Sequence, residues 1–278
     1  MSGPNVEISC NSSSILYFKD MMTKQDQPKA VTAAMLVVGD EILSGRTKDK
    51  NIGTVADFCA DLSIDLCEAR IVADEIDEIV AAINALRAKY DYVFTSGGIG
   101  PTHDDITADA VAKAFGVELN VDQRAIDAMQ ARFVDYEMTE GRLRMARIPE
   151  GGELIDNPVS GAPGIQIENV FVMAGVPKIL QAMLESIAPT LKTGVPQYSV
   201  FVNSQVGEGV LSAPLAALQS SYQTVKIGSY PQLGSKDYMT QIVMRSSDEK
   251  ILEQVRHEAQ AIVDDLFEKA KKGQGPTI

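Results

Sequence analysis

Hydrophobic residues along residues 32–192 follow two alternating patterns. A continuous apolar run at Ala33–Val38 predicts a strand that is buried on both faces, and Leu66–Val72 and Tyr90–Thr95 are predicted to be the second and third strands. Apolar residues at helical spacing predict the helices that follow these strands, at 52–62, 76–86 and 106–115. Strands that alternate with helices indicate βαβ units, so we expect a three-layer α/β/α domain with a mostly parallel sheet.

The pattern changes after residue 115. A helix is predicted around Ile126, Met129 and Phe133, whereas 138–163 has many Pro and Gly residues and is predicted to be a long active-site loop. Two short apolar runs, 164–167 and 170–173, predict a hairpin. A further helix begins at Pro177, where proline is favoured because its missing N–H would have no partner.

The polar segment 1–30 and the linker-like stretch 193–196 divide the chain. We expect residues 1–30 to be a mobile extension, 31–192 to form the α/β domain and 197–278 to form a small α+β domain. In the last part, strands and helices are predicted in the order β-α-β-β-α, at 199–203, 210–220, 225–229, 238–244 and 249–267.

The composition excludes several functions. A formal charge of −13 disfavours nucleic-acid and anionic-membrane partners, because both require a basic surface. No apolar run approaches the roughly 18 residues of a membrane span, and no signal peptide is recognisable. We therefore expect a cytoplasmic protein. Its cysteines, Cys10, Cys59 and Cys67, are too few and too scattered for a disulfide framework and are predicted to be buried structural thiols.

Acidic residues follow two of the predicted strands. Asp40 and Glu41 come after the first strand, and Asp104 and Asp105 come after the third. Ligands of parallel α/β sheets bind at the carboxyl ends of the strands, where these four carboxylates would repel one another unless they shared a cation. Oxygen ligands suit Mg²⁺ or Mn²⁺, with Co²⁺ an option if His103 takes part.

A glycine-rich loop precedes the second acidic pair. Ser96, Gly97, Gly98 and Gly100 allow close approach to the backbone, and the helix start near Ile106 offers N–H groups that suit phosphate. The spacing matches neither a P-loop nor a G-x-G-x-x-G dinucleotide loop, and the chain has no G-x-S-x-G elbow. The residues alone therefore indicate a phosphate-binding or metal-assisted site.

Each candidate also has a structural interpretation. Asp105 could cap the following helix, and Asp40-Glu41 could be an ordinary turn pair. His103 could structure its loop, and Gly228-Ser229-Tyr230-Pro231 could be either a turn between strands or a ligand contact.

Two long motifs resemble one known superfamily. They are Gly39-Asp40-Glu41-Ile42-Leu43-Ser44-Gly45, with Asn51 following, and Ser96-Gly97-Gly98-Ile99-Gly100-Pro101-Thr102-His103-Asp104-Asp105-Ile106-Thr107. Together they resemble the MoaB/Mog-like molybdopterin-binding superfamily, and are closest to the N-terminal module of CinA-type proteins and the molybdopterin-binding-like domain of eukaryotic FAD synthases. Gly228-Ser229-Tyr230-Pro231 with Gly234-Ser235 resembles the C-terminal part of the latter domain. The family's Pro-Gly-Val-Pro is Ala174-Gly175-Val176-Pro177 here.

The resemblance implies a divalent-metal-dependent nucleotide pyrophosphatase acting on ADP-ribose- or FAD-like nucleotides and helped by K⁺. It also suggests a homo-oligomer, with a homodimer favoured over a higher oligomer. Asp104, Asp105 and Asp40 would be catalytic, and with Glu41 would hold the metal. The implied substrate-binding residues are Gly39, Glu41, Asn51, Ser96, Gly97, Gly98, Gly100, Thr102, Thr107, Gly175 and Pro177. The alternatives are a molybdopterin-binding or adenylating protein and a regulatory protein without chemistry. We expect neither the deamidase module of CinA nor the nucleotidyltransferase module of FAD synthase.

Overall fold

The computed structural model describes residues 30–132, 137–232 and 237–272. The expected mobile extension, residues 1–30, lies outside this range except for Ala30. The chain divides between Gly194 and Val195 into two compact units, within the stretch predicted as a linker. Each unit has a hydrophobic core of its own.

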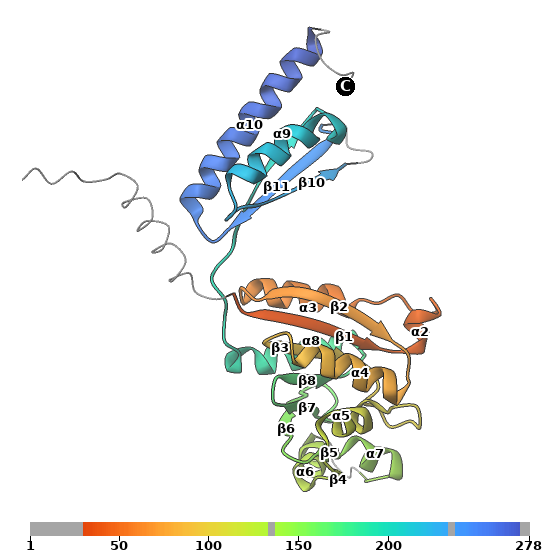
Figure 1. Ribbon diagram of the computed structural model, residues 1–278. Helices are drawn as coiled ribbons and strands as arrows, with labels where there is room; N and C mark the ends of the chain where they lie inside the picture. Colours follow the sequence, from red (N-terminus) through yellow and green to blue (C-terminus); the bar gives the residue numbers. More distant parts are fainter. Residues whose placement is uncertain (1–29, 133–136, 233–236, 273–278) are drawn as a thin grey trace, which may run out of the picture. The chain divides into compact units, whose positions relative to one another are not determined.

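The first unit is built on a six-stranded sheet with the strand order β2-β1-β3-β8-β7-β6 (Figure 1). Its strands are β1 (Thr32–Val38), β2 (Asp65–Val72), β3 (Tyr92–Ser96), β6 (Glu153–Ile155), β7 (Gly164–Ile167) and β8 (Val170–Met173). β1, β2, β3 and β8 are parallel, whereas β7 runs in the opposite direction and pairs antiparallel with both β8 and β6. The prediction of a mostly parallel sheet is confirmed, and β1 and β3 are neighbours in it.

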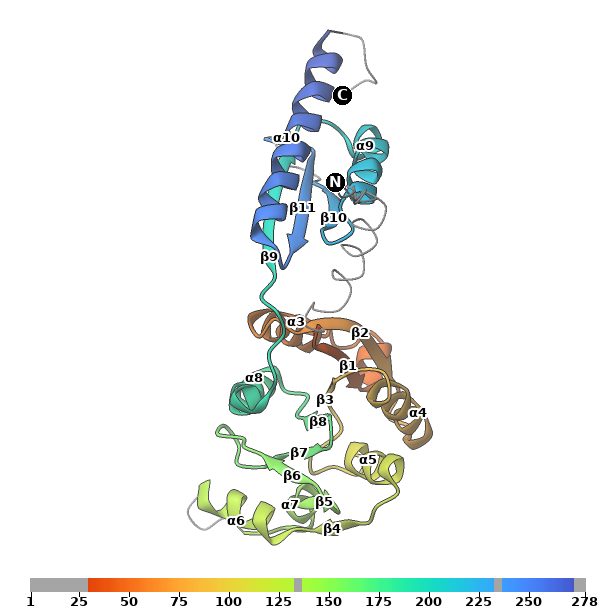
Figure 2. The same ribbon diagram turned by 60° about the vertical axis from the view of Figure 1, so that its left-hand side comes forward.

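Helices cover both faces of this sheet (Figure 2). One face packs against α3 (Asn51–Asp61) and α8 (Pro177–Ile187), and the other packs against α4 (Ile76–Arg87), α5 (Thr107–Phe115) and α6 (Gln123–Arg132). Strand β1 shows why the sequence requires two layers of helices. Ala33, Met35 and Val37 belong to one core, whereas the alternate residues Ala34, Leu36 and Val38 belong to the other.

Two predictions for this unit are wrong. Residues 138–163 are not a structureless loop, because they contain α7 (Glu140–Met145), β5 (Arg147–Pro149) and β6, and β5 pairs with β4 (Leu119–Val121). These elements are too short for periodicity to reveal. Asp40-Glu41 is likewise not a simple turn, since it begins the short helix α2 (Asp40–Leu43). A 3₁₀ turn, Ala188–Thr190, follows α8.

The cysteine prediction holds for one of the two described thiols. Cys59 is fully buried in α3, and burial raises the pKa of its thiol to about 12. Cys67 is exposed, contrary to expectation, because β2 lies at the edge of the sheet and is not covered on all sides. Cys10 lies outside the described residues.

The second unit has the predicted β-α-β-β-α order. It contains β9 (Tyr198–Ser204), α9 (Glu208–Ser221), β10 (Lys226–Pro231), β11 (Thr240–Ser246) and α10 (Glu249–Lys271). The antiparallel strands lie in the order β10-β11-β9. Helix α10 begins where predicted because the Asp248 carboxylate accepts hydrogen bonds from the N–H groups of Lys250 and Ile251. No helix of the described residues is both long enough and apolar enough to cross a membrane.

Candidate functional site

The ends of the four parallel strands meet around one cavity of about 650 Å³. Strand β1 is followed there by Gly39 and Glu41, and β8 by 174–177. Strand β3 leads into the glycine-rich loop, which we define as residues 96–107. The structure thus brings together nine of the predicted site residues along the cavity, namely Gly39, Glu41, Gly97, Gly98, Gly100, Asp104, Asp105, Gly175 and Pro177.

The glycine-rich loop turns sharply at two glycines. Gly97 has a φ of 104°, and a Cβ at this position would lie 2.2 Å from the carbonyl oxygen of Val38. Gly98 has a φ of 68°, and a Cβ there would lie 2.1 Å from the Thr107 hydroxyl. Both the backbone conformation and the available space therefore require glycine.

The next part of the loop presents backbone donors to the cavity. Within the described residues, the N–H groups of Gly98, Ile99 and Gly100 have no hydrogen-bond acceptor, although all three residues line the cavity. Consecutive unpaired N–H groups in such a turn form a concave surface that binds anions. Such a loop would suit the phosphate group that the sequence analysis expected.

Three predicted substrate-binding residues are buried and do not line the cavity. We call Asn51, Ser96 and Thr107 the support residues; all three are buried. The Asn51 amide donates to the Ser96 hydroxyl at 2.6 Å and to the Gly175 carbonyl at 2.8 Å. The Thr107 hydroxyl and N–H each donate at 2.9 Å, to the Gly97 and Gly98 carbonyls respectively. These residues hold the loop in place.

Asp105 is fixed by Thr102. One carboxylate oxygen, Oδ2, accepts the Thr102 N–H at 2.8 Å and the Thr102 hydroxyl at 2.5 Å. Helix α5 has no side-chain cap, so the alternative interpretation of Asp105 as a helix cap is not found. The second oxygen, Oδ1, accepts no hydrogen bond from the described residues. A carboxylate that is fixed through one oxygen, and whose other oxygen accepts no hydrogen bond, can bind a cation or orient water.

Asp40 pairs with a residue that the sequence analysis missed. Its N–H donates to the Asp74 carboxylate at 2.8 Å, and its own carboxylate accepts from the Asp74 N–H at 3.4 Å. Asp40 does not line the cavity, whereas Asp74 does. Asp74 lies two residues after the end of β2, so the rule that ligands bind at strand ends would have found it.

Electrostatic repulsion is concentrated at Asp74. Partial burial raises the pKa of its carboxyl, and the negative charges of Asp40, Glu41 and Asp104 raise it further. The hydrogen bond from Asp40 opposes this shift without overcoming it. The shared repulsion shows that these carboxylates lie close enough to sense one another.

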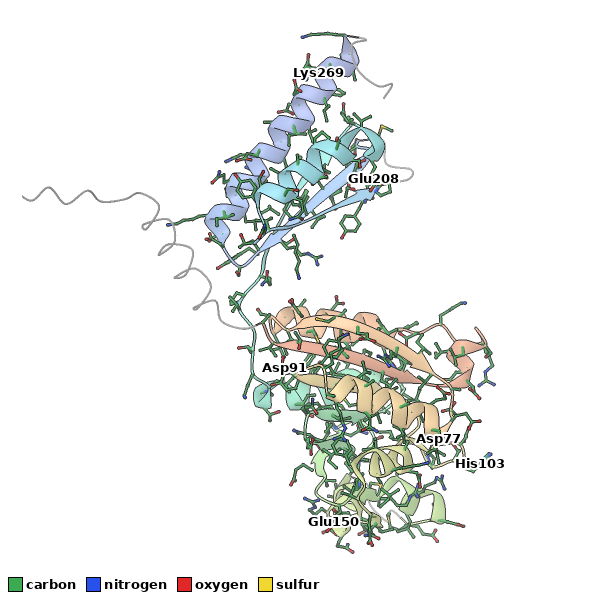
Figure 3. The ribbon with its side chains drawn as sticks, viewed as in Figure 1. Asp77, Asp91, His103, Glu150, Glu208 and Lys269 are labelled. Atoms are coloured by element: carbon green, nitrogen blue, oxygen red, sulfur yellow. The ribbon has the colours of Figure 1, made fainter. Side chains whose placement is uncertain are left out.

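Asp104 has a different environment. The pKa of the Asp104 carboxyl is lowered, and the largest cause is the nearby Thr102 hydroxyl, with smaller contributions from His103 and Arg144. The short hydrogen bond of the Thr102 hydroxyl itself goes to Asp105. The side chain of His103 is 99% exposed and projects into solvent (Figure 3). His103 does not line the cavity, and its Nδ1 lies 3.9 Å from the Asp104 carboxylate.

The carboxylates do not form a preformed metal site. Among the described residues, no three His, Cys, Asp or Glu side chains converge closely enough to hold an ion. The chemistry of the donors nevertheless suits a hard cation, since Glu41, Asp74, Asp104 and Asp105 all offer carboxylate oxygens to one cavity. A cation would need further oxygen ligands from another source.

The segment that was predicted to be a loop supports the site. Arg144 of α7 donates to the carbonyl oxygens of His103 and Asp105, both at 3.3 Å. Arg147 forms a two-point ion pair with Asp109 of α5, at 2.8 and 2.7 Å. These contacts join α7 to the glycine-rich loop and β5 to α5, and sequence periodicity gave no sign of them.

The cavity lining also includes apolar side chains, namely Met145, Ala162, Val176 and Ile179. Asn157 and Ser160 add polar atoms, but the Asn157 amide is committed to Ser160 and the Ala162 carbonyl. A ligand that combines an anionic part with an uncharged ring would match this mixture of polar and apolar lining.

The second glycine motif is part of a strand. Gly228, Ser229, Tyr230 and Pro231 belong to β10 and pair with β11, so this stretch is not a turn. The Ser229 hydroxyl donates to the Glu208 carboxylate at 2.5 Å, and the Tyr230 side chain is exposed. Gly234 and Ser235 lie outside the described residues.

Comparison with known proteins finds a matching family for each of the two units. Residues 34–193 match the family described as "Probable molybdopterin binding domain", and residues 196–269 match "FAD synthase, middle domain". A protein of Caldivirga maquilingensis is 31% identical over 86% of this chain and 96% of its own length. The probable FAD synthase of Caenorhabditis briggsae is 30% identical over 81% of this chain, which spans about half (48%) of that relative.

A solved structure also resembles the first unit. The protein CinA of Thermoplasma acidophilum, described as having unknown function, is 34% identical with a TM-score of 0.55. The match covers 58% of this chain and 98% of that structure. The chain therefore belongs to the molybdopterin-binding-domain family of MoaB/Mog-like proteins, with a second unit of the FAD synthase middle-domain type.

Proposed function

We propose that this protein hydrolyses the phosphoanhydride bond of ADP-ribose- or FAD-like nucleotides with the help of a divalent cation. One observation carries the proposal. The unpaired N–H groups of Gly98, Ile99 and Gly100 line the same cavity as the carboxylates of Glu41, Asp104 and Asp105. Backbone donors alone would suit any phosphate, whereas acidic residues beside them require a cation between carboxylate and phosphate.

The chain's own residues would bind different parts of the substrate. The N–H groups of the glycine-rich loop would donate to the diphosphate oxygens, and the apolar side chains of Val176 and Ile179 would contact the ring. Asp105, held by Thr102, would keep its open oxygen Oδ1 directed to a fixed place. Such prepositioning reduces the cost of ordering the reacting groups.

Carboxylates that line one cavity without converging on a single point suit a cation that arrives bound to the substrate. Mg²⁺ is commonly held by one or two carboxylates together with substrate phosphates, and does not need a cage formed by the protein alone. Asp104, Asp105 and Glu41 would hold it, with Asp40 acting through its hydrogen bonds to Asp74. When bound, the ion would polarise a phosphoryl oxygen and activate water. Mn²⁺ or Co²⁺ could replace Mg²⁺, and K⁺ would assist.

The relatives support nucleotide chemistry in general terms. Two of them are named probable FAD synthases, and the second unit matches the middle domain of such enzymes. Hydrolysis, the identity of the nucleotide, a cytoplasmic location and a homodimer are our proposals.

A release assay tests the proposal. The purified protein is incubated with ADP-ribose, FAD, NAD or CoA and Mg²⁺, Mn²⁺ or Co²⁺, with and without K⁺, and AMP or phosphate is measured. We expect metal-dependent AMP release from ADP-ribose or FAD. Asp105→Ala should fold normally, because its carboxylate is near the surface, yet lose at least about 100-fold in turnover. Undiminished hydrolysis by this variant would rule out the mechanism.

A second function is favoured by the family match of the first unit. A probable molybdopterin binding domain could bind or adenylate a pterin phosphate without any hydrolysis. The mixture of backbone donors, carboxylates and apolar side chains that line the cavity suits such a ligand equally well. Calorimetric titration with molybdopterin, ADP-ribose and FAD separates the two functions. Tight pterin binding without nucleotide cleavage would favour this second function over hydrolysis.

A further inference from the structure

The cavity contains one basic side chain that no prediction included. Among the described residues that line it, Arg46 is the only Arg or Lys. Arg46 lies in the loop after α2, where the Thr47 N–H donates to the Glu41 carbonyl at 2.9 Å. This hydrogen bond folds the loop back, and places Arg46 beside the acidic part of the cavity.

Three arginines lie near the glycine-rich loop, and Arg46 differs from the other two. Arg144 donates to backbone carbonyls, and Arg147 is ion-paired with Asp109. Arg46 forms no hydrogen bond or ion pair with any described residue, although four carboxylates line the same cavity. An arginine with a structural role beside so many carboxylates would be expected to pair with one of them.

A diphosphate would add further negative charge to this cavity. The carboxylates of Glu41, Asp74, Asp104 and Asp105 already line it. A guanidinium is always charged, and its planar set of donors matches phosphate oxygens. We propose that Arg46 binds the phosphate groups of the ligand, donating from its guanidinium to oxygens that the glycine-rich loop does not reach. The proposal rests on the phosphate-bearing ligand of the proposed function.

The test measures binding without turnover. Inorganic pyrophosphate with Mg²⁺ is titrated calorimetrically into the full chain at low ionic strength. We compare the wild type with Arg46→Gln, Arg46→Lys and Lys48→Gln. Lys48 is the matched control, because it is exposed in the same loop and does not line the cavity. Thermal unfolding of each variant confirms that the fold is retained.

Arg46→Gln should weaken pyrophosphate binding about tenfold or more, as expected for the loss of a hydrogen bond between charged groups. Arg46→Lys should recover part of this affinity, since it keeps the charge but loses the planar geometry. Lys48→Gln should bind like the wild type. Unchanged affinity in Arg46→Gln, equal losses in both loop variants, or no pyrophosphate binding by the wild type would each overturn the assignment.

The result separates this inference from the proposed hydrolysis. If Arg46→Gln alone loses pyrophosphate while no nucleotide is cleaved by the wild type, Arg46 is a phosphate-binding residue and the hydrolase proposal fails. If the wild type cleaves nucleotides and Arg46→Gln retains both full pyrophosphate affinity and full turnover, the inference about Arg46 fails and the hydrolase proposal stands.

Discussion

The support residues and the cavity-lining carboxylates come from the same two sequence motifs but have opposite environments. Asn51, Ser96 and Thr107 are buried and use their polar atoms to hold the backbone. Asp104 and Glu41 line the cavity. Changes in the support residues should therefore alter the stability of the protein, whereas changes in the cavity-lining carboxylates should alter ligand binding with little loss of stability.

The largest expected effect is at Gly97. Gly97→Ala would place its Cβ 2.2 Å from the Val38 carbonyl oxygen at a φ of 104°, so the backbone itself would have to move. We expect the free energy of unfolding, measured in urea, to fall by about 3 kcal/mol.

Gly53→Ala is the matched control for Gly97. Gly53 lies exposed in α3, and nothing lies within 4 Å of its hypothetical Cβ. This substitution should stabilise the protein by about 0.5–1 kcal/mol, because alanine favours helix more than glycine does. Similar effects of the two substitutions would show that the close contact at Gly97 has no energetic importance.

Asn51→Ala should have a smaller effect on stability. It removes two hydrogen bonds of this support residue and leaves the Gly175 carbonyl without this donor. We expect a loss of about 1–3 kcal/mol in the free energy of unfolding. Asn120→Ala, which removes an exposed amide bonded to Glu118, should change it by less than about 0.5 kcal/mol. Equal stability of the two variants would contradict a supporting role for Asn51.

Asp74→Asn changes one of the cavity-lining carboxylates, and in contrast to the substitutions above it should stabilise the protein. The folded-state pKa of Asp74 is raised above its unfolded value of about 3.9, so the folded state binds more protons between these two values. Stability therefore falls as the pH rises through this interval, and the loss is complete above the folded pKa.

Asp74→Asn removes this loss, and at neutral pH we expect a gain below about 1 kcal/mol, measured as the thermal midpoint from pH 3.5 to 7. The same variant should weaken binding of a Mg²⁺–nucleotide complex. If the variant is less stable at neutral pH and binds the ligand as the wild type does, Asp74 does not act together with the other cavity-lining carboxylates.

Much of the fold could be predicted because long elements carry clear periods. The buried run of β1 and the apolar stripes of α4 and α8 are strong signals, and all correspond to observed elements. By contrast, α7, β5 and β6 have three to six residues each, which is too short for a period to emerge. Their positions depend on contacts such as Arg147–Asp109, which join residues 38 positions apart.

The site was predictable in its backbone and only partly in its side chains. The glycine-rich loop and its acidic neighbours are visible as motifs, and they do line one cavity. The sequence could not show that Asn51 and Ser96 turn inward, since this depends on how β3 and α3 pack. Asp74 and Arg46 lie outside the glycine-rich loop and reach the cavity only through the fold.

The central claim is that carboxylates and backbone donors share a nucleotide diphosphate through a cation. Calorimetric titration of Mn²⁺, with and without the non-hydrolysable analogue α,β-methylene-ADP, tests it most directly. We predict weak Mn²⁺ binding alone, about 10-fold or more tighter binding with the analogue, and loss of this coupling in Asp105→Ala. Tight Mn²⁺ binding without the nucleotide, or equal nucleotide affinity with and without the ion, would contradict the claim.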